Sequence, residues 1–231
     1  RRQRFFGASL ADGFDNAVDP QWRADLFTLI HQTPNLDWLL LTKRICNVQP
    51  MLAELAHGND HDLSLLEMMP LPNVWIGATI TSQAEADRDI PKLLAVPARV
   101  RFLSMEPLLG PVSFEGMFAN PRNPADGTNA LEALDWVIVG GESGTGARPM
   151  HPEWALSLRN QCTATGVAFL FKQWGEWSPG YAEHGNDLGY DAIVDAAQHQ
   201  WPEGHCSFKV GKNAAGRLLD GRTWDEVPTT P

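Results

Sequence analysis

Residues 134–150 read LDWVIVGGESGTGARPM, and this stretch says the most about the fold of the chain. Its apolar run, residues 136–139, ends at Gly140-Gly141, and the sequence His151-Pro152-Glu153 further on predicts the start of a helix. The pattern indicates a buried strand that opens into a glycine-rich turn and returns through a helix. Proteins of the α/β class use this arrangement to place polar groups at the carboxyl end of a parallel sheet.

The same arrangement recurs along the chain. Six apolar runs of strand length lie at residues 5–10, 38–42, 74–79, 100–104, 136–139 and 167–171. Helix signals lie between most of them: Asp19-Pro20, a weaker segment at 50–56, a capping-box sequence at 82–85, and His151-Pro152 with Gly166 as the stop. This alternation predicts an α/β fold with about six parallel strands and right-handed crossovers. From the spacing alone, a barrel and an open doubly wound sheet both fit.

Two segments depart from the alternation. Prolines and glycines fill the connection 107–124, which predicts a long loop. Beyond Trp177, glycines interrupt every pattern, so the sequence predicts a loop-rich C-terminal extension. We therefore expect an α/β unit over residues 1–177 and an extension over residues 178–231 that packs against it.

The composition narrows the classes of function. The chain has 231 residues and a formal net charge of −10, which disfavours an extensive surface for duplex nucleic acid or for an anionic membrane. No apolar run approaches the roughly 18 residues of a transmembrane helix, and no signal peptide is recognisable, so we expect a cytoplasmic protein. The chain starts at Arg1, almost inside its first predicted strand, and we expect a segment to precede it.

Neither the cysteines nor the histidines have the spacing of metal ligands. Cys46, Cys162 and Cys206 lie far apart, which predicts free thiols rather than a zinc site or an iron–sulfur cluster. His57 and His61 have helical spacing, but the Gly-Asn-Asp between them favours a turn. We therefore expect no metal site in this chain.

Polar side chains follow each predicted strand at its carboxyl end. They are Ser9 and Asp12; Thr42, Lys43 and Arg44; Thr79 and Thr81; Ser104 and Glu106; Glu142 and Ser143; and Lys172, Gln173 and Trp174. Parallel strands bring all of these to one rim. Such a mixture of carboxylates, cations and hydroxyls is typical of an active site.

Each candidate also has a structural interpretation. Lys43 fits a solvated helix start, although a cation there opposes the helix dipole. Glu106 fits a loop cap, and Gly140-Gly141 fits a turn that needs positive φ. Lys172 follows an apolar strand and would be costly to bury alone, so it either pairs with a carboxylate or binds an anionic ligand.

Several motifs together are similar to a known family. In chain order, LDWLLLTKR, NVWIGATI, VRFLSMEPLLGPV, LDWVIVGGESGTGARPM, FLFKQWGEW and GRLLDGRTWDEVP resemble an uncharacterised family of bacteriophage and prophage proteins, the phage gp thirty-seven and gp sixty-eight type. The resemblance covers almost the whole chain. Members of that family look like radical-SAM proteins, with a cysteine-rich segment upstream of this region that is suited to hold a [4Fe–4S] cluster.

The resemblance implies a radical-SAM-like partial (β/α) barrel of the TIM type that lacks the cluster ligands. S-adenosylmethionine and a [4Fe–4S] cluster are the cofactors it implies for a full-length form, and this chain by itself is expected to hold no cluster. Lys43 resembles the lysine that meets the carboxylate of S-adenosylmethionine in the spore-type DNA-lyase branch. Ser9 and Asp12 are then expected to face the methionine moiety.

Two sets of site residues follow from the rim and the resemblance. The expected cofactor-binding residues are Ser9, Asp12, Thr42, Lys43, Gly140, Gly141 and Ser143. The expected catalytic residues, on the substrate side, are Glu106, Glu142 and Lys172.

Three functions stay open on the sequence alone. The first is a radical-SAM-type enzyme that acts on a small-molecule or nucleotide-containing substrate, with the cofactor carrying the chemistry. The second is a non-catalytic module that binds a small anionic ligand or a phage or host partner. A hydrolase that uses Glu106 and Glu142 as an acid–base pair ranks last, because the chain has no nucleophile elbow or metal motif.

Overall fold

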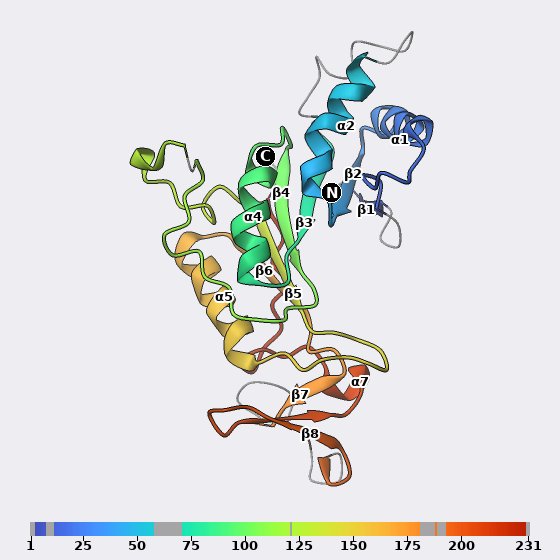
Figure 1. The fold of residues 1–231 in the computed structure, drawn as a ribbon. Coiled ribbons are helices and arrows are strands. Elements are labelled where there is room, and N and C mark those ends of the chain that lie inside the picture. Colours follow the sequence, from blue (N-terminus) through green and yellow to red (C-terminus); the bar gives the residue numbers. More distant parts are fainter. Residues whose placement is uncertain are drawn as a thin grey trace.

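The computed structural model shows one parallel sheet that curls into a half-barrel (Figure 1). The structure describes residues 3–7, 12–57, 71–120, 122–180, 188 and 193–229. The strand order in the sheet, β1 to β6, is the order along the chain, and all neighbours are parallel. A doubly wound sheet reverses its strand order at a switch point, so the structure selects the barrel-type alternative.

Strands and helices alternate as the sequence predicts. The strands are β1 (Gln3–Gly7), β2 (Leu36–Thr42), β3 (Val74–Thr79), β4 (Val100–Met105), β5 (Trp136–Gly140) and β6 (Ala168–Gln173). The helices between them are α1 (Pro20–Gln32), α2 (Ile45–His57), α4 (Gln83–Leu94) and α5 (Pro152–Thr165). In its described part, the long connection from β4 to β5 contains one short 3₁₀ turn, η1 (Pro124–Asp126), which agrees with the predicted loop.

Local signals set several helix ends. The carboxylate of Asp19 accepts a hydrogen bond from the backbone N–H of Gln21 at 2.8 Å and so caps α1. Helix α5 ends at Thr165 and is followed by Gly166, whose φ of 74° is left-handed. Within the described ranges, no helix is both long enough and apolar enough to cross a membrane.

Two elements begin earlier than the sequence predicts. Helix α2 begins at Ile45 instead of residue 50, because the carbonyl of Arg44 already accepts the N–H of Asn47 and starts the first turn. Pro50 therefore lies inside the helix, where its missing N–H removes one hydrogen bond. Strand β1 also begins before residue 5, while residues 8–10 of the predicted strand lie outside the described residues.

Strands β2 to β5 are largely buried on both faces, as their nearly continuous apolar sequences predict, whereas β1 is exposed except at Gly7. The convex face packs against the helices in the main core, which includes Trp38, Leu40, Ile76, Leu103 and Phe171. The concave face has a smaller apolar cluster, made of Leu39, Trp75, Val100, Phe102, Trp136 and Ile138. We call this second set the concave cluster. It fills the half-barrel near the start of β3, β4 and β5, so open space remains toward the carboxyl ends of the strands.

Gly77 makes room for the concave cluster. It lies in register with Phe102 on the neighbouring strand, and the ring of Phe102 folds over it. A Cβ atom at residue 77 would lie 2.3 Å from two carbons of that ring. The ring is fully buried and packs 5.9 Å from Trp136 between ring centres, so it has little room to move.

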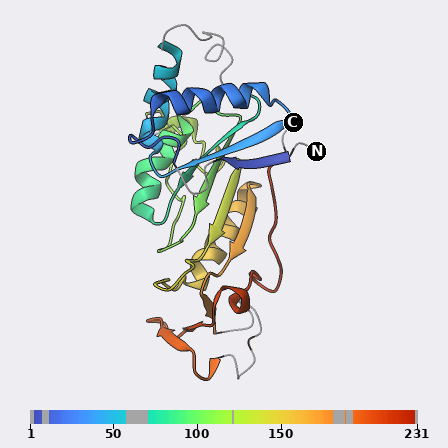
Figure 2. The ribbon, with the colours of Figure 1, turned by 90° about the vertical axis from the view of Figure 1, so that its right-hand side faces the viewer.

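The C-terminal extension is more regular than the loops that the sequence predicts. Strands β7 (Trp177–Pro179), β9 (Cys206–Lys209) and β8 (Ala197–Gln200) form an antiparallel sheet in that order, followed by the short helix α7 (Lys212–Ala215). This small sheet lies at the lower end of the molecule in Figures 1 and 2. Each of its strands has at most four residues, and β8 is mostly exposed and polar, so no apolar periodicity marked them.

After α7 the chain turns back along β6 as a segment that we call the C-terminal strap, residues 216–229 (red in Figure 2). The carbonyl of Trp224 accepts the N–H of Phe171 at 3.0 Å, and the carbonyl of Phe169 accepts the N–H of Glu226 at 3.2 Å. The indole of Trp224 packs against the guanidinium of Arg222. The strap therefore pairs with the outer edge of β6, an edge that would otherwise be open.

His151 joins α5 to the small sheet. It is the N-cap residue of α5, and its Nδ1 accepts the backbone N–H of Glu153 at 3.1 Å. Its buried ring lies 4.7 Å from Trp201 and 6.0 Å from His205 between ring centres, and its Nε2 lies 3.5 Å from the carboxylate of Glu203. Burial lowers the pKa of His151 below 6.5, and the two nearby glutamates oppose this only in part.

We predict that Gly77→Ala destabilises the fold by about 1–3 kcal/mol, because the added methyl group overpacks the ring of Phe102. Urea unfolding followed by circular dichroism measures this change. Gly110→Ala is the matched control, since a Cβ atom there meets no heavy atom within 4 Å. Equal stability of the two variants would contradict the packing role of Gly77.

We also predict that acid weakens the fold through His151. Because its pKa is lower in the folded chain than in the unfolded chain, the unfolded chain binds more protons, and stability falls as the pH drops below 6.5. The variant His151→Asn keeps a capping acceptor but does not titrate, so its free energy of unfolding should fall less between pH 7.5 and pH 5. His31→Asn, at an exposed position on α1, is the control. An unchanged pH dependence in His151→Asn would refute the assignment.

Candidate functional site

A cavity of about 610 Å³ lies on the concave face, toward the carboxyl ends of the strands. All six strands and the strap contribute to its wall, which consists of Phe6, Leu41, Lys43, Thr79, Ser104, Glu106, Trp136, Ile138, Leu170, Lys172, Arg217 and Asp225. Its size is in the range of small-molecule sites, roughly 300–1,000 Å³. The wall is apolar along the strands and charged where the strands end.

Glu106 and Lys172 pair across the position of Gly140. Gly140 ends β5, which lies between β4, the strand before Glu106, and β6, the strand that contains Lys172. The carboxylate of Glu106 lies 2.9 Å from Lys172 Nζ and accepts the hydroxyl of Ser104 at 3.3 Å. A Cβ atom at Gly140 would lie 2.9 Å from Glu106 Oε2. The missing side chain of Gly140 therefore leaves the carboxylate its place beside Lys172.

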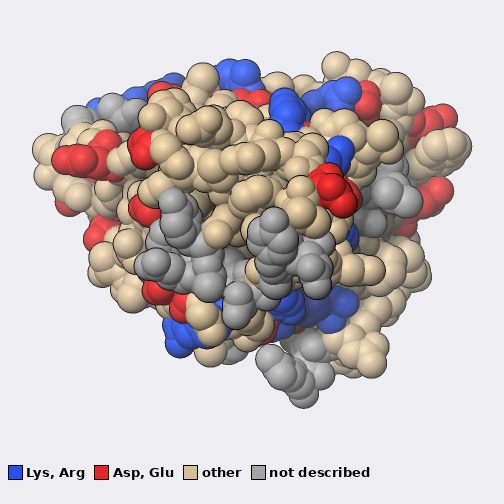
Figure 3. All heavy atoms as spheres, turned by 90° about the horizontal axis from the view of Figure 1, so that it is seen from below, with Lys and Arg blue, Asp and Glu red and all other residues tan. Residues whose placement is uncertain are grey.

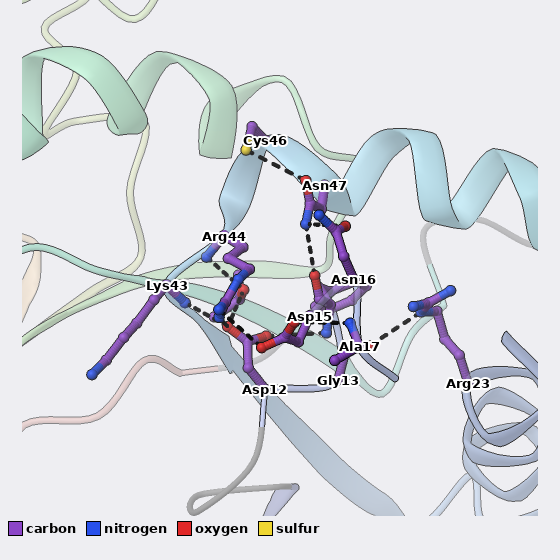
Figure 4. Close-up of polar contacts among 12 residues, drawn as sticks. Asp12, Gly13, Asp15, Asn16, Ala17, Arg23, Lys43, Arg44, Cys46 and Asn47 are labelled. Atoms are coloured by element: carbon purple, nitrogen blue, oxygen red, sulfur yellow. Dashed lines mark hydrogen bonds and ion pairs between the residues drawn. The ribbon is translucent and has the colours of Figure 1, made fainter. Parts of the chain in front are cut away.

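Lys43 is placed by the turn that follows β2. The carboxylate of Asp12 accepts the hydroxyl of Thr42 at 2.9 Å and the backbone N–H of Lys43 at 3.0 Å. The guanidinium of Arg44 faces the carboxylates of Asp12 and Asp15, and it lies 2.9 Å from Asp15. The side chain of Lys43 points away from these carboxylates (Figure 4). In the described part of the chain, no carboxylate forms an ion pair with the ammonium of Lys43. Asp12 and Thr42 thus hold the turn that carries Lys43 in place, and neither residue lines the cavity.

Glu142 and Ser143 lie in the loop after β5, outside the cavity wall. The guanidinium of Arg148 donates to both carboxylate oxygens of Glu142 at 2.8 Å, and the backbone N–H of Arg148 donates as well. These contacts hold the pKa of Glu142 at about 2, so it stays ionised and donates no proton near neutral pH. The side-chain amide of Gln173 donates to Ser143 at 3.2 Å. The geometry gives no support to an acid–base pair of Glu142 with Glu106.

Gly140-Gly141 is required for close packing. Neither residue has the positive φ that one interpretation of the sequence expects. Instead, a Cβ atom at Gly141 would lie 1.9 Å from the carbonyl oxygen of Trp174, because the loops after β5 and β6 pass backbone against backbone. The N–H of Gly141 donates to the carbonyl of Gln173 at 2.9 Å in the same crossing.

Arg217 and Asp225 belong to the cavity but were not among the residues predicted for the site. They form an ion pair within the strap, and Asp225 lies opposite Leu170 of β6. Sequence reasoning missed them because they lie far beyond the last predicted strand. The motif GRLLDGRTWDEVP contains both, and its density of charged residues beside a tryptophan was the available signal.

The structure therefore brings together Lys43, Glu106 and Lys172 of the predicted set. It places Asp12 and Thr42 behind the cavity, Gly140 and Gly141 in the packing beneath its rim, and Glu142 and Ser143 in a neighbouring loop. Ser9 lies outside the described residues.

The three cysteines do not converge. Cys46 is exposed on α2, Cys162 is buried on α5 and Cys206 lies on β9. Burial raises the pKa of the Cys162 thiol to about 12, which disfavours the thiolate that a metal needs. No group of three or more His, Cys, Asp or Glu side chains suited to a metal occurs among the described residues. These residues do not fit a [4Fe–4S] cluster.

A second cavity lies on the opposite side of the sheet. It measures about 790 Å³ and is bordered by α2, α4 and residues 119, 120 and 122. Its described lining has two cations, Lys92 and Arg122, and Lys92 is paired with Asp89 at 2.8 Å. It contains no residue from the carboxyl ends of the strands, so the concave cavity is the better candidate.

The charge of the concave cavity differs from that of the chain. Its wall holds three cations and two carboxylates, whereas the whole chain has a net charge of −10. On the face shown in Figure 3, basic and acidic side chains of the described residues are interspersed around a broad uncharged area. The arrangement suits a small ligand with an anionic group and an apolar part.

Comparison with known proteins bears on the family alone. No curated protein and no solved structure matches the chain. A family model described as "Protein of unknown function (DUF5131)" matches residues 1–228. The chain belongs to this family, and its half-barrel and concave cavity are the structural features from which a function can be inferred.

Proposed function

We propose that the protein is a radical-SAM-like protein whose half-barrel binds S-adenosylmethionine in the concave cavity. The single observation that carries the proposal is the ammonium of Lys43, which lies in the cavity wall with no ion-pair partner among the described residues. A cation held in that state is an anchor for a ligand carboxylate. The specific ligand comes from the resemblance to an uncharacterised phage and prophage family whose members look like radical-SAM proteins.

The cavity also offers groups for the rest of such a ligand. Phe6 is 42% exposed although it lies on the sheet, so its ring presents an apolar surface for a nucleobase. Leu41 lies in the same wall. Glu106 offers a carboxylate for an amino group. Bound S-adenosylmethionine supplies group-transfer or radical chemistry, and the residues named here bind and orient it.

The proposal gives this chain ligand binding and assigns it no reductive step. The positions of Cys46, Cys162 and Cys206 do not fit a cluster, so radical chemistry needs thiolates other than these three. We therefore propose radical-SAM enzyme activity only for a form of the protein that contains such additional thiolates. Three free cysteines also support our proposal that the protein acts in the reducing cytoplasm.

A non-catalytic binding module is the second candidate. The observation that favours it is that both carboxylates of the cavity, Glu106 and Asp225, already neutralise cations of the same wall. Such a site recognises charge without an obvious free acid or base. It predicts binding of a small anionic ligand other than S-adenosylmethionine, and no turnover.

We predict that Lys43→Ala weakens S-adenosylmethionine binding by about tenfold to a hundredfold, the effect of losing one charge-assisted hydrogen bond. Isothermal titration calorimetry measures the affinity. Lys212→Ala is the control, since Lys212 is exposed at the start of α7 and is not part of the cavity. If the unaltered protein binds no S-adenosylmethionine, or if Lys43→Ala binds it equally well, the proposal fails and the second candidate takes its place.

A further inference from the structure

Two ion pairs lie next to each other at the carboxyl end of β6. Lys172 of β6 pairs with Glu106, which follows β4. Arg217 and Asp225, which both belong to the strap, pair with each other. Asp225 lies opposite Leu170, and Leu170 and Lys172 are two residues apart on the same face of β6. The two cations therefore come from different elements but lie in one wall of the cavity.

Both cations remain accessible to a ligand. The side chain of Lys172 is 55% exposed and that of Arg217 is 45% exposed, so neither is sealed inside its pair. Ion pairs at this degree of exposure contribute little to stability, typically about 0–1 kcal/mol. A structural role alone gives a weak reason for four charged groups at the mouth of one cavity.

The chemistry of the two cations is complementary. The guanidinium of Arg217 offers a planar fork that matches two oxygens of a phosphate or a carboxylate, and the ammonium of Lys172 adds a compact point charge. The carboxylates of Glu106 and Asp225 hold both cations in place while no ligand is bound. An incoming oxyanion can replace these carboxylates at small cost, because the pairs are weak.

We propose that Lys172 and Arg217 form an oxyanion subsite for the substrate, which carries a phosphate or a carboxylate group. The inference rests on one part of the proposed function, namely that the concave cavity binds a ligand. It adds a second position beside the one that Lys43 provides: Lys43 extends from β2, whereas Lys172 and Arg217 lie at β6 and the strap. The substrate is thereby an anionic small molecule bound at the strap side of the cavity.

The test uses inorganic phosphate and acetate as probes, titrated at constant ionic strength and followed by NMR chemical shifts of the full chain. Lys172→Gln and Arg217→Gln should each weaken binding of the preferred probe by about tenfold, the loss of one charged contact. Lys212→Gln and Arg88→Gln are the matched controls, since both residues are exposed and line neither cavity. A stronger response to phosphate identifies a phosphorylated substrate, and a stronger response to acetate identifies a carboxylate.

Removing the competing carboxylates gives an opposite and more specific result. Glu106→Gln and Asp225→Asn free the two cations, so each should bind the probe several-fold more tightly than the unaltered protein. A merely structural role for the pairs predicts no gain. Equal binding in all variants, or equal loss in the controls, overturns the inference. Failure of S-adenosylmethionine to bind while these shifts persist would remove the proposed function and leave the subsite.

Discussion

The parallel order of the six strands is the constraint on which the site depends. Because each strand pairs with the one before it in the chain, every carboxyl end emerges on the same rim. The curl of the sheet then turns those ends toward each other around a concave face. Lys43, Glu106 and Lys172 are far apart in the sequence and share one cavity wall for this reason alone.

Glycines on the strands and at the strand ends determine how closely other groups pack inside the half-barrel. Gly77 accepts the ring of Phe102, and this overlap helps the concave cluster to fill the half-barrel near the start of the strands. Gly140 leaves space for Glu106 to reach Lys172, and Gly141 lets two loops cross at backbone distance. Glycines thus make room both for the apolar cluster inside the half-barrel and for the charged pair at its rim. That division allows a cavity to recognise a charged group and an apolar group of one ligand.

The C-terminal strap completes both the sheet and the site. It pairs with the exposed edge of β6 through main-chain hydrogen bonds, and the indole of Trp136 donates to the carbonyl of Glu226 at 2.9 Å. The same strap brings Arg217 and Asp225 into the cavity wall. One segment therefore protects a sheet edge and contributes a cation and a carboxylate to the candidate site.

The sequence by itself determined the alternation of strands and helices, the parallel sheet, and the identity of three charged residues in the cavity wall. These features depend on local periodicity and on helix caps such as Asp19 and Gly166, which act within a few residues. Only the tertiary structure decided that Glu142 turns to Arg148 instead of the cavity, and that Arg217 and Asp225 enter it. The pair of Glu142 with Arg148 is only six residues apart, but it depends on the irregular conformation of one loop. The entry of Arg217 and Asp225 depends on which segments meet across the half-barrel. Contacts between residues far apart in the chain leave no periodic trace in the sequence.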